Sequence, residues 1–568
     1  MKKYLKQLSV LIAMVCLFIV TATTAQASTF KDVTYKYWAY KDIQFVAQNN
    51  VIRGFADGNF RPGYAISRKD AAVMMTRALD LYSLEDRPTP VEDLLPTSPG
   101  YNEIMIALEN YWLSLDKGQF NPDAPLTRDE MSKMLATAYA YEGKGYSEFS
   151  DVPIEDPYYR FIDAIAFHDV TTGYNDGSFR PKETVTRAQF SAFLSRVYQQ
   201  PVAYEVRNAG EVIDVVSSVD DAVEKVAYYP EGTIHPQSNE FVEYSQTIAS
   251  ADKTNLKSGA LIYNGFKEIE NFTPQFFSHY LKTKPVNGIQ QDMFETFVIL
   301  GLRYNENSDQ FVDGPSNHAN YEDWKTYIDR TFNADGAIQN LNTAAKWANR
   351  KVDVYVAIPY PKRNEAIINL NGDEVGSDVY ARYDLANWYV KEVLKEFENG
   401  QYDNINFKGF YWLSETVRTV DDEVIISSIS SLLKKHDKFF IYSPHATSTN
   451  FYKWKDYGFD AAFLQPNAFR ATTPNKEERL HRAFLNAQIY GTGITIEIDS
   501  YHMDKAEQGV EAFDLYMDIS KRYGLDEKGM MFYQGTNMVE RMATFDHPVY
   551  KRWYEQLTET FFNKDSIE

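Results

Sequence analysis

The first third of the chain contains one pattern three times, and this repetition constrains the fold more than any other feature of the sequence. Each copy holds an aspartate near its start, a glycine turn followed by Phe and Pro, and a Ser-Arg or Thr-Arg pair. These pairs are Ser67-Arg68, Thr127-Arg128 and Thr186-Arg187, so the period is about sixty residues. Self-similarity at a fixed spacing indicates one supersecondary unit used repeatedly, with each copy burying its apolar side against the next.

Each copy is predicted to fold as a helix, a loop and a second helix. Residues 38–49 carry apolar side chains on one side, as an amphipathic helix does. The Asp-Gly-x-Phe-x-Pro stretch at 57–62 is predicted to be a loop, because glycine adopts a positive φ and proline ends the segment. Ser67, Thr127 and Thr186 occupy the N-cap position of the second helix. The middle copy is weaker, because it lacks the Phe-x-Asp-Val opening of the other two.

These motifs resemble S-layer homology repeats, the wall-anchoring modules of Gram-positive surface proteins, over residues 30–200. The resemblance implies a three-pronged α-helical module that binds secondary cell-wall polysaccharide carrying pyruvate ketals. The ligand contacts implied by motif are Asp32, Trp38, Arg68, Arg128, Asp151 and Arg187. An arginine beside a helix N-terminus suits an anion, because a bidentate guanidinium and free backbone N–H groups converge there. The alternative is that these arginines pair with the aspartates of their own repeat.

Residues 1–27 have the features of a secretory signal peptide. Three lysines precede an apolar run at 8–20, and Ala25-Gln26-Ala27 forms a small-x-small cleavage site. The run is too short for a comfortable membrane span, so no transmembrane anchor is expected after cleavage. The sole cysteine, Cys16, lies inside this run, so the mature protein is expected to have neither disulfides nor a cysteine-based zinc site. We therefore expect a secreted protein of the Gram-positive cell wall or S-layer.

The formal charge of −21 at pH 7 argues against nucleic acid as a partner, since phosphate binding needs a basic surface. The domains are expected at 28–85, 86–145 and 146–200 for the three repeats, 201–257 for a connector and 258–568 for a C-terminal domain. In the connector, residues 204–216 alternate as a short hairpin does, and residues 218–229 are predicted to form a helix. The connector is either a spacer or the first layer of the next domain.

After residue 257 the pattern changes to short apolar runs separated by helical stretches. Eight runs occur, at 259–265, 296–304, 352–359, 407–415, 438–444, 459–466, 493–499 and 530–535. Strict alternation of strands and helices predicts a parallel sheet, and eight such units in about 300 residues fit a (β/α)8 TIM barrel. A doubly wound open sheet is the alternative. No Gly-x-Gly-x-x-Gly or Walker-type loop is present, so no nucleotide cofactor is expected.

Polar residues gather at the ends of these runs, where a barrel carries its active site. The candidate substrate-binding residues are Asn264, Arg303, Tyr360, Tyr442, His445, Gln465, Asn467 and Gln534. Two carboxylates, Glu415 and Glu497, lie at the ends of the fourth and seventh runs, and Asp499 is a rival for either role. In the seventh run isoleucines alternate with the acids, which directs the acids to the barrel axis. A charge there is costly unless it is solvated, paired or functional, and a structural salt bridge is the alternative.

The arrangement resembles the retaining glycoside hydrolases of clan A, which are built on this barrel. By that resemblance Glu415 would be the acid/base and Glu497 the nucleophile, with the two carboxyl groups about 5–5.5 Å apart. Arg303 would hold the nucleophile ionised through its positive charge. One departure is Ser414, because members of that clan usually have asparagine immediately before the strand-four acid. The region also resembles a poorly characterised barrel family found beside S-layer repeats in spore-forming bacteria.

Two classes of function are open for the barrel. The first is a wall-anchored glycoside hydrolase acting on a polysaccharide, and the second is a non-catalytic glycan-binding barrel that serves as a surface adhesin or wall organiser. A zinc peptidase is disfavoured because the nine histidines form no His-Glu-x-x-His motif, and no metal is expected. A serine hydrolase is disfavoured because no Gly-x-Ser-x-Gly elbow occurs.

Overall fold

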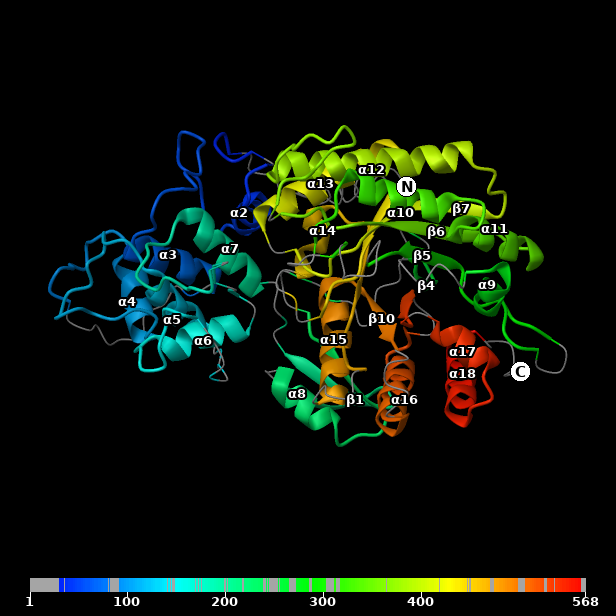
Figure 1. Ribbon diagram of the computed structural model, residues 1–568. Helices are drawn as coiled ribbons and strands as arrows, with labels where there is room; N and C mark the ends of the chain where they lie inside the picture. The colour runs from blue at the N-terminus through cyan, green and yellow to red at the C-terminus, as the bar shows by residue number, and fades with distance from the viewer. Residues whose placement is uncertain are drawn as a thin grey trace, which may run out of the picture. The chain divides into compact units, whose positions relative to one another are not determined.

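The computed structural model describes residues 30–562 with internal gaps, of which the longest are 82–90, 245–253, 265–271, 303–310 and 499–505. The predicted signal peptide therefore lies outside the described residues, as do Arg303 and Asp499. The chain divides into two compact units, Met1–Gln200 and Pro201–Glu568 (Figure 1). In the described part of the chain, no helix is long and apolar enough to cross a membrane.

The first unit is built from helices that pack across the copies of the sequence pattern. They are α2 (Tyr40–Gln48), α3 (Arg68–Ala78), α4 (Tyr101–Glu109), α5 (Arg128–Ala138), α6 (Tyr159–Phe167) and α7 (Arg187–Tyr198). Helix α3 contacts α4 of the next copy, α5 contacts α6, and α7 returns to α2 (Figure 1). The contacts therefore close into a ring. Ser67 caps α3 by accepting the N–H of Asp70, and Thr127 forms a capping box with Glu130 at the start of α5.

Equivalent hydrogen bonds occur within the three copies and between them. In each copy one aspartate accepts two backbone N–H groups from the glycine turn, and these aspartates are Asp32, Asp93 and Asp151. The arginine Nε of each copy donates to a phenylalanine carbonyl of the next, from Arg68 to Phe120, Arg128 to Phe179 and Arg187 to Phe60, each at 2.8 Å. The middle segment, weak in sequence, thus has the same local geometry as its neighbours.

A small sheet begins the second unit. Its strands β1 (Tyr204–Asn208), β2 (Glu211–Val216) and β3 (Gly232–Pro236) are antiparallel in the order β2-β1-β3, with α8 (Val219–Val226) packed on them. The apolar side of this sheet shares a core cluster with Leu485 of α15 (Lys476–Tyr490). The N–H of Ile234 donates to the hydroxyl of Tyr523 at 2.9 Å. The predicted hairpin and helix are present, and this segment is a layer on the barrel rather than a free spacer.

The second unit is centred on a closed barrel of parallel strands. They are β4 (Ser258–Tyr263), β5 (Thr296–Leu300), β6 (Val352–Ile358), β7 (Ile405–Trp412), β8 (Phe439–Tyr442), β9 (Ala461–Leu464), β10 (Gly493–Glu497) and β11 (Met530–Tyr533). They pair in chain order, and β11 pairs with β4 to close the barrel. Each predicted apolar run overlaps one strand, and the closure excludes the open doubly wound sheet. Gly409 is required where β7 meets β8, because a Cβ there would lie 1.9 Å from the Phe439 carbonyl oxygen.

Helices follow the strands and surround them (Figure 1). They are α9 (Pro274–Leu281), α10 (Tyr321–Phe332), α11 (Ala337–Trp347), α12 (Val379–Asn399), α13 (Val420–Lys435), η2 (Phe451–Lys453), α14 (Trp454–Tyr457), α15, α16 (Ala506–Arg522), α17 (Met538–Thr544) and α18 (Pro548–Phe561). The helical stretch between β5 and β6 is two helices, since α11 starts anew at the cap Gly336. The connection between β8 and β9 is the least helical, with α14 only 4 residues long.

Candidate functional site

A cavity of about 560 Å³ lies at the end of the barrel where the strands terminate. The structure brings several sequence-predicted residues to its lining, namely Glu415, Glu497, His445, Gln465 and Asn467. Three tyrosines at strand ends, Tyr263, Tyr411 and Tyr533, complete much of the wall. The cavity thus combines carboxylates, polar side chains and aromatic rings at the position where parallel barrels carry their sites.

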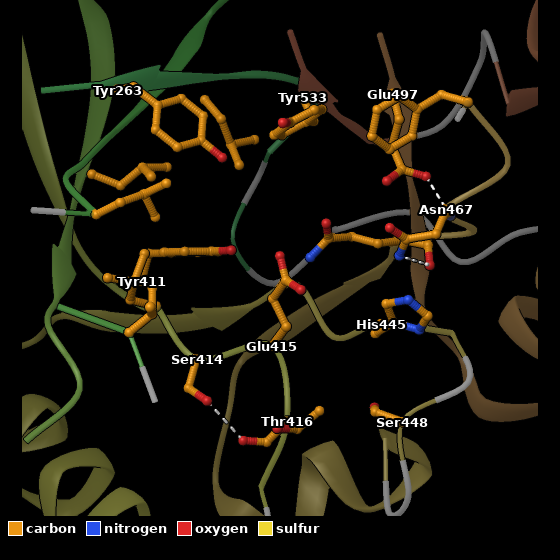
Figure 2. A pocket seen from close by; sticks show the side chains of 17 residues that line it. Tyr263, Tyr411, Ser414, Glu415, Thr416, His445, Ser448, Asn467, Glu497 and Tyr533 are labelled. Carbon is orange, nitrogen blue, oxygen red and sulfur yellow. Dashed lines mark hydrogen bonds between the residues drawn. The ribbon is translucent and has the colours of Figure 1, made fainter. Parts of the chain in front are cut away.

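Glu415 lies three residues beyond the end of β7 and is exposed. Its carbonyl oxygen accepts the N–H of His445 at 3.2 Å, which ties together the loops after β7 and β8. Figure 2 shows the Glu415 carboxylate rising toward the centre of the cavity, with Tyr411 beside it. Burial raises the pKa of the Tyr411 hydroxyl, and the negative charge of Glu415 raises it further. Tyr411 is therefore a neutral phenol in the neutral pH range.

Glu497 is the last residue of β10 and only 2% exposed. Its Oε2 accepts two hydrogen bonds, from the backbone N–H of Asn467 and from the hydroxyl of Tyr516, both at 2.5 Å. Two donors on one carboxylate oxygen stabilise the ionised form. Figure 2 shows Glu497 beside Asn467 on the upper right wall, with Glu415 below and to the left. The two glutamates therefore reach one cavity from β10 and from the loop after β7.

The polar wall is held by bonds within its own loops. Gln465 Nε2 donates to the Ser443 carbonyl at 2.6 Å, and Asn467 Nδ2 donates to the Gln465 carbonyl at 3.3 Å. Asn467 has a left-handed φ of 53°, a conformation that asparagine tolerates better than most residues. This turn places the Asn467 N–H on Glu497. Among the described residues, no group of three or more His, Cys, Asp or Glu could hold a metal ion.

An aromatic part of the wall adjoins Glu497, because Tyr533 is its register partner on β11, and the sequence analysis did not single it out. The rings of Tyr263 and Tyr533 meet edge to face with centroids 5.9 Å apart, and Phe469 lies 5.6 Å from Tyr533. Both tyrosines end barrel strands, so the same strand-end argument that selected Glu497 applies to them. Tyr516 had no comparable signal, because it lies in the middle of the amphipathic helix α16.

Four predicted substrate contacts do not line the cavity and have structural partners instead. Asn264 is fully buried and donates to Thr331 Oγ1 at 2.7 Å. Gln534 donates to the Leu261 carbonyl at 3.2 Å. The buried Tyr360 hydroxyl donates to Asp422 at 2.8 Å, and buried Tyr442 stacks on Phe459 with ring centroids 4.6 Å apart. A position at the end of a strand therefore does not by itself determine whether a side chain points into the cavity or toward the helices around the barrel.

In the repeat unit, the predicted aspartates bond within their own copy, whereas the predicted arginines lie in the joints between copies. Asp32 and Asp151 are occupied by backbone N–H groups of their own turns. Arg68 is 7% exposed and pairs with Glu130, and it also donates to the Ser114 carbonyl at 2.6 Å. Arg187 donates to the Arg53 carbonyl at 2.7 Å. Trp38 is 61% exposed.

Arg128, like Arg187, forms no ion pair among the described residues, whereas Arg68 does. It is 4% exposed, and its guanidinium lies 4.5 Å from the ring centroid of Phe179 and 4.9 Å from that of Tyr174. In the part of the chain that the structure describes, it forms no ion pair. Burial lowers its pKa, and negative charge at Tyr174 and Glu183 opposes this shift. Arg128 is thus a largely desolvated cation without a paired carboxylate.

These features define a two-part protein, a ring of helical repeats followed by a parallel barrel with two carboxylates in its mouth. Residues 258–559 match the family model described as "Domain of unknown function (DUF4855)". The match covers more than half of the chain, and the chain belongs to that family. Residues 29–72 and 148–191 match the model of the S-layer homology domain. These two matches fall on the first and third copies of the sequence pattern.

Several curated proteins are similar to parts of the chain. The "Surface-layer 125 kDa protein" of Lysinibacillus sphaericus is 31% identical over 202 residues, 34% of this chain and 17% of that protein. The "S-layer protein sap" of Bacillus anthracis is 25% identical over 244 residues, 41% of this chain and 30% of that protein. The chain therefore spans less than a third of the length of either relative. An "Endoglucanase" of Bacillus sp. (strain KSM-635) is 25% identical over 193 residues, 32% of this chain and 20% of that protein.

Among solved structures, a "GH5-4 broad specificity endoglucanase from an uncultured bacterium" aligns with a TM-score of 0.32 and 9% identity. The alignment covers 57% of this chain and 98% of that one. This likeness carries no conclusion about activity.

Proposed function

We propose that this protein is a wall-anchored glycoside hydrolase whose barrel cuts a polysaccharide with Glu415 and Glu497. The observation that supports it most is that both carboxylates line one cavity at the strand ends, Glu415 after β7 and Glu497 on β10. These are the fourth and seventh barrel strands, which carry the acid/base and the nucleophile in the clan A hydrolases that the sequence resembles. The aromatic and hydroxyl-bearing walls suit a sugar ring.

The chemistry of a retaining hydrolase assigns each glutamate a role. In the first step a carboxylate oxygen of Glu497 bonds to the anomeric carbon, the glycosidic C–O bond breaks, and Glu415 gives its proton to the leaving oxygen. In the second step Glu415 takes a proton from water, whose oxygen displaces Glu497 from the anomeric carbon. The environment of Glu497 fits the nucleophile, because two hydrogen-bond donors stabilise its ionised form, and Glu415 reaches the same cavity from an exposed position.

Replacing each glutamate tests this assignment. Glu497→Gln is expected to abolish cleavage of chromogenic glycosides and wall polysaccharide while leaving sugar binding intact, because the shape stays and the nucleophile is lost. Glu415→Gln should slow turnover by about 10²–10⁴-fold, the usual contribution of a general acid. Glu392→Gln on α12 removes a surface carboxylate and serves as the matched control. Full activity of Glu497→Gln, or a product of inverted configuration in NMR, would contradict the mechanism.

A glycan-binding barrel without catalysis is the second candidate, and one residue favours it. Ser414 stands where clan A hydrolases have the asparagine that grips the sugar 2-hydroxyl. Its hydroxyl donates to the Thr416 carbonyl at 3.0 Å (Figure 2). Saturable glycan binding without product, across chromogenic glycosides and wall extracts, would support an adhesin or wall organiser over an enzyme.

For the first unit, the proposal is a three-repeat S-layer homology module that binds secondary cell-wall polysaccharide after secretion from a Gram-positive cell. The matched first and third segments support it, and so does the middle segment, because Asp93 and Arg128 repeat the bonds of their counterparts. Co-sedimentation with wall sacculi tests the anchor. Binding should be lost when mild acid removes pyruvate ketals, and binding that survives this treatment would exclude the ketal as the ligand group.

A further inference from the structure

The hydroxyl of Tyr516 contacts Glu497 although Tyr516 does not line the cavity. Tyr516 lies on α16, is 0% exposed and donates to Glu497 Oε2 at 2.5 Å. The Tyr516 oxygen also accepts the N–H of Ala468 at 3.3 Å. The neighbouring N–H of Asn467 donates to the same carboxylate oxygen of Glu497. One oxygen of Glu497 is therefore fixed by the loop after β9 and by a helix that follows its own strand.

This arrangement counters the effect of burial on Glu497. Desolvation penalises a carboxylate charge, and hydrogen-bond donors to that charge restore it. A phenol can act as a donor only while it keeps its proton. Burial raises the pKa of Tyr516 well above its usual value, and the negative charge of Glu497 adds to this shift. Tyr516 therefore remains a donor through the neutral pH range.

Other charged and titratable groups face this pair from the surrounding elements. Arg479 of α15 acts electrostatically on Tyr516 and itself donates to the Pro466 carbonyl at 3.3 and 3.2 Å. Glu415, His445, Tyr263 and Tyr533 share the cavity with Glu497, from the loops after β7 and β8 and from the ends of β4 and β11. Within the described residues, these groups and Tyr516 form the titrating environment of Glu497.

We propose that Tyr516 is a positioning residue, which together with the Asn467 N–H holds Glu497 ionised and in place on the cavity wall. It acts through Glu497, because it does not line the cavity itself. The part of this inference that is tested by turnover rests on the proposed hydrolase function. The part that concerns the ionisation of Glu497 does not, because it is measured without substrate.

The test follows the side-chain carboxyl ¹³C signal of Glu497 through a pH titration of the full chain, with the signal assigned by its loss in Glu497→Gln. Tyr516→Phe removes the donor and keeps the ring. It should raise the titration midpoint by about one pH unit or more. The acidic limb of kcat/KM against pH should move up equally, with KM little changed. Tyr389→Phe is the matched control, a buried tyrosine whose hydroxyl donates to the Ala357 carbonyl at 3.0 Å.

A second substitution covers the case in which Tyr516→Phe does not fold. Incorporating 3-fluorotyrosine at position 516 keeps the hydroxyl and makes it a stronger donor, so the midpoint should fall instead of rise. An unchanged midpoint in the fluorotyrosine protein, or in a folded Tyr516→Phe, overturns the proposal, and so does an equal shift in Tyr389→Phe. Full turnover of Glu497→Gln would instead end the hydrolase proposal, while the titration still decides the role of Tyr516.

Discussion

At the scale of single residues, three arginines at equivalent positions have different partners. Arg68 pairs with Glu130, which is the third residue of the next copy's helix. The corresponding residue opposite Arg128 is Gln189, and Arg128 forms no ion pair among the described residues. The resemblance to the repeat motif assigns the same ligand-binding role to all three arginines. The motif includes the arginine itself but not the residue that faces it in the next copy. Which guanidinium is available to an external anion depends on a side chain in the neighbouring repeat.

Gln189→Glu would give Arg128 the carboxylate partner that Arg68 already has. Gln189 Oε1 accepts the N–H of Thr186 at 2.9 Å, and a glutamate makes the same capping bond, so the helix start is preserved. We expect the variant to bind anionic wall polysaccharide about tenfold more weakly, since an internal carboxylate competes for the guanidinium. Co-sedimentation with sacculi measures this. Glu130→Gln is the converse control and should not weaken binding, whereas wild-type affinity of Gln189→Glu would show that Arg128 takes no part.

At the scale of elements, the strands were predictable because barrel strands are buried on both faces and are therefore continuous apolar runs. The same regularity brought Glu415 and Glu497 to one cavity, since the ends of parallel strands meet at one end of the barrel. Side-chain partners were not predictable. Asn264 turns to Thr331 and Tyr360 to Asp422, because buried polar atoms take whichever partner the packed helices bring near.

Helices α12 and α13 are joined by a buried ion pair that provides a stability test. Arg382 and Asp422 are each 1% exposed and 2.7 Å apart, and the Tyr360 hydroxyl donates to the same Asp422 oxygen. Arg382→Met should cost about 3–5 kcal/mol, because it leaves a buried carboxylate without its cation. Tyr360→Phe should cost less, about 1.5–3 kcal/mol, because it removes one hydrogen bond to a charged group. Urea unfolding of the barrel unit measures the loss of stability in both variants. An equal loss would contradict the expectation that the ion pair contributes more than the tyrosine hydrogen bond.

At the scale of the whole second unit, a buried histidine connects the small sheet to the barrel helices. His481 of α15 hydrogen-bonds through Nδ1 with the Tyr523 hydroxyl at 2.9 Å, and that hydroxyl accepts the N–H of Ile234 on β3. Burial, followed by the positive charge of Arg522, lowers the pKa of His481 from 6.5 to about 3. The Glu477 carboxylate lies 3.9 Å from His481 Nε2 and 3.9 Å from Arg522, so its negative charge is shared between the two residues.

This neutral histidine predicts an acid-sensitive docking of the small sheet. Since its folded pKa lies below the unfolded value, the unfolded chain binds the proton first as pH falls. The contribution of His481 to stability is complete above pH 6.5 and is lost between 6.5 and about 3, at up to about 1.4 kcal/mol per pH unit. His481→Gln should reduce this slope, whereas His436→Gln, at an exposed histidine, should keep it. Hydrogen exchange of peptides from β3 and α15 across this range measures it, and identical slopes in both variants would show that another group controls the acid response.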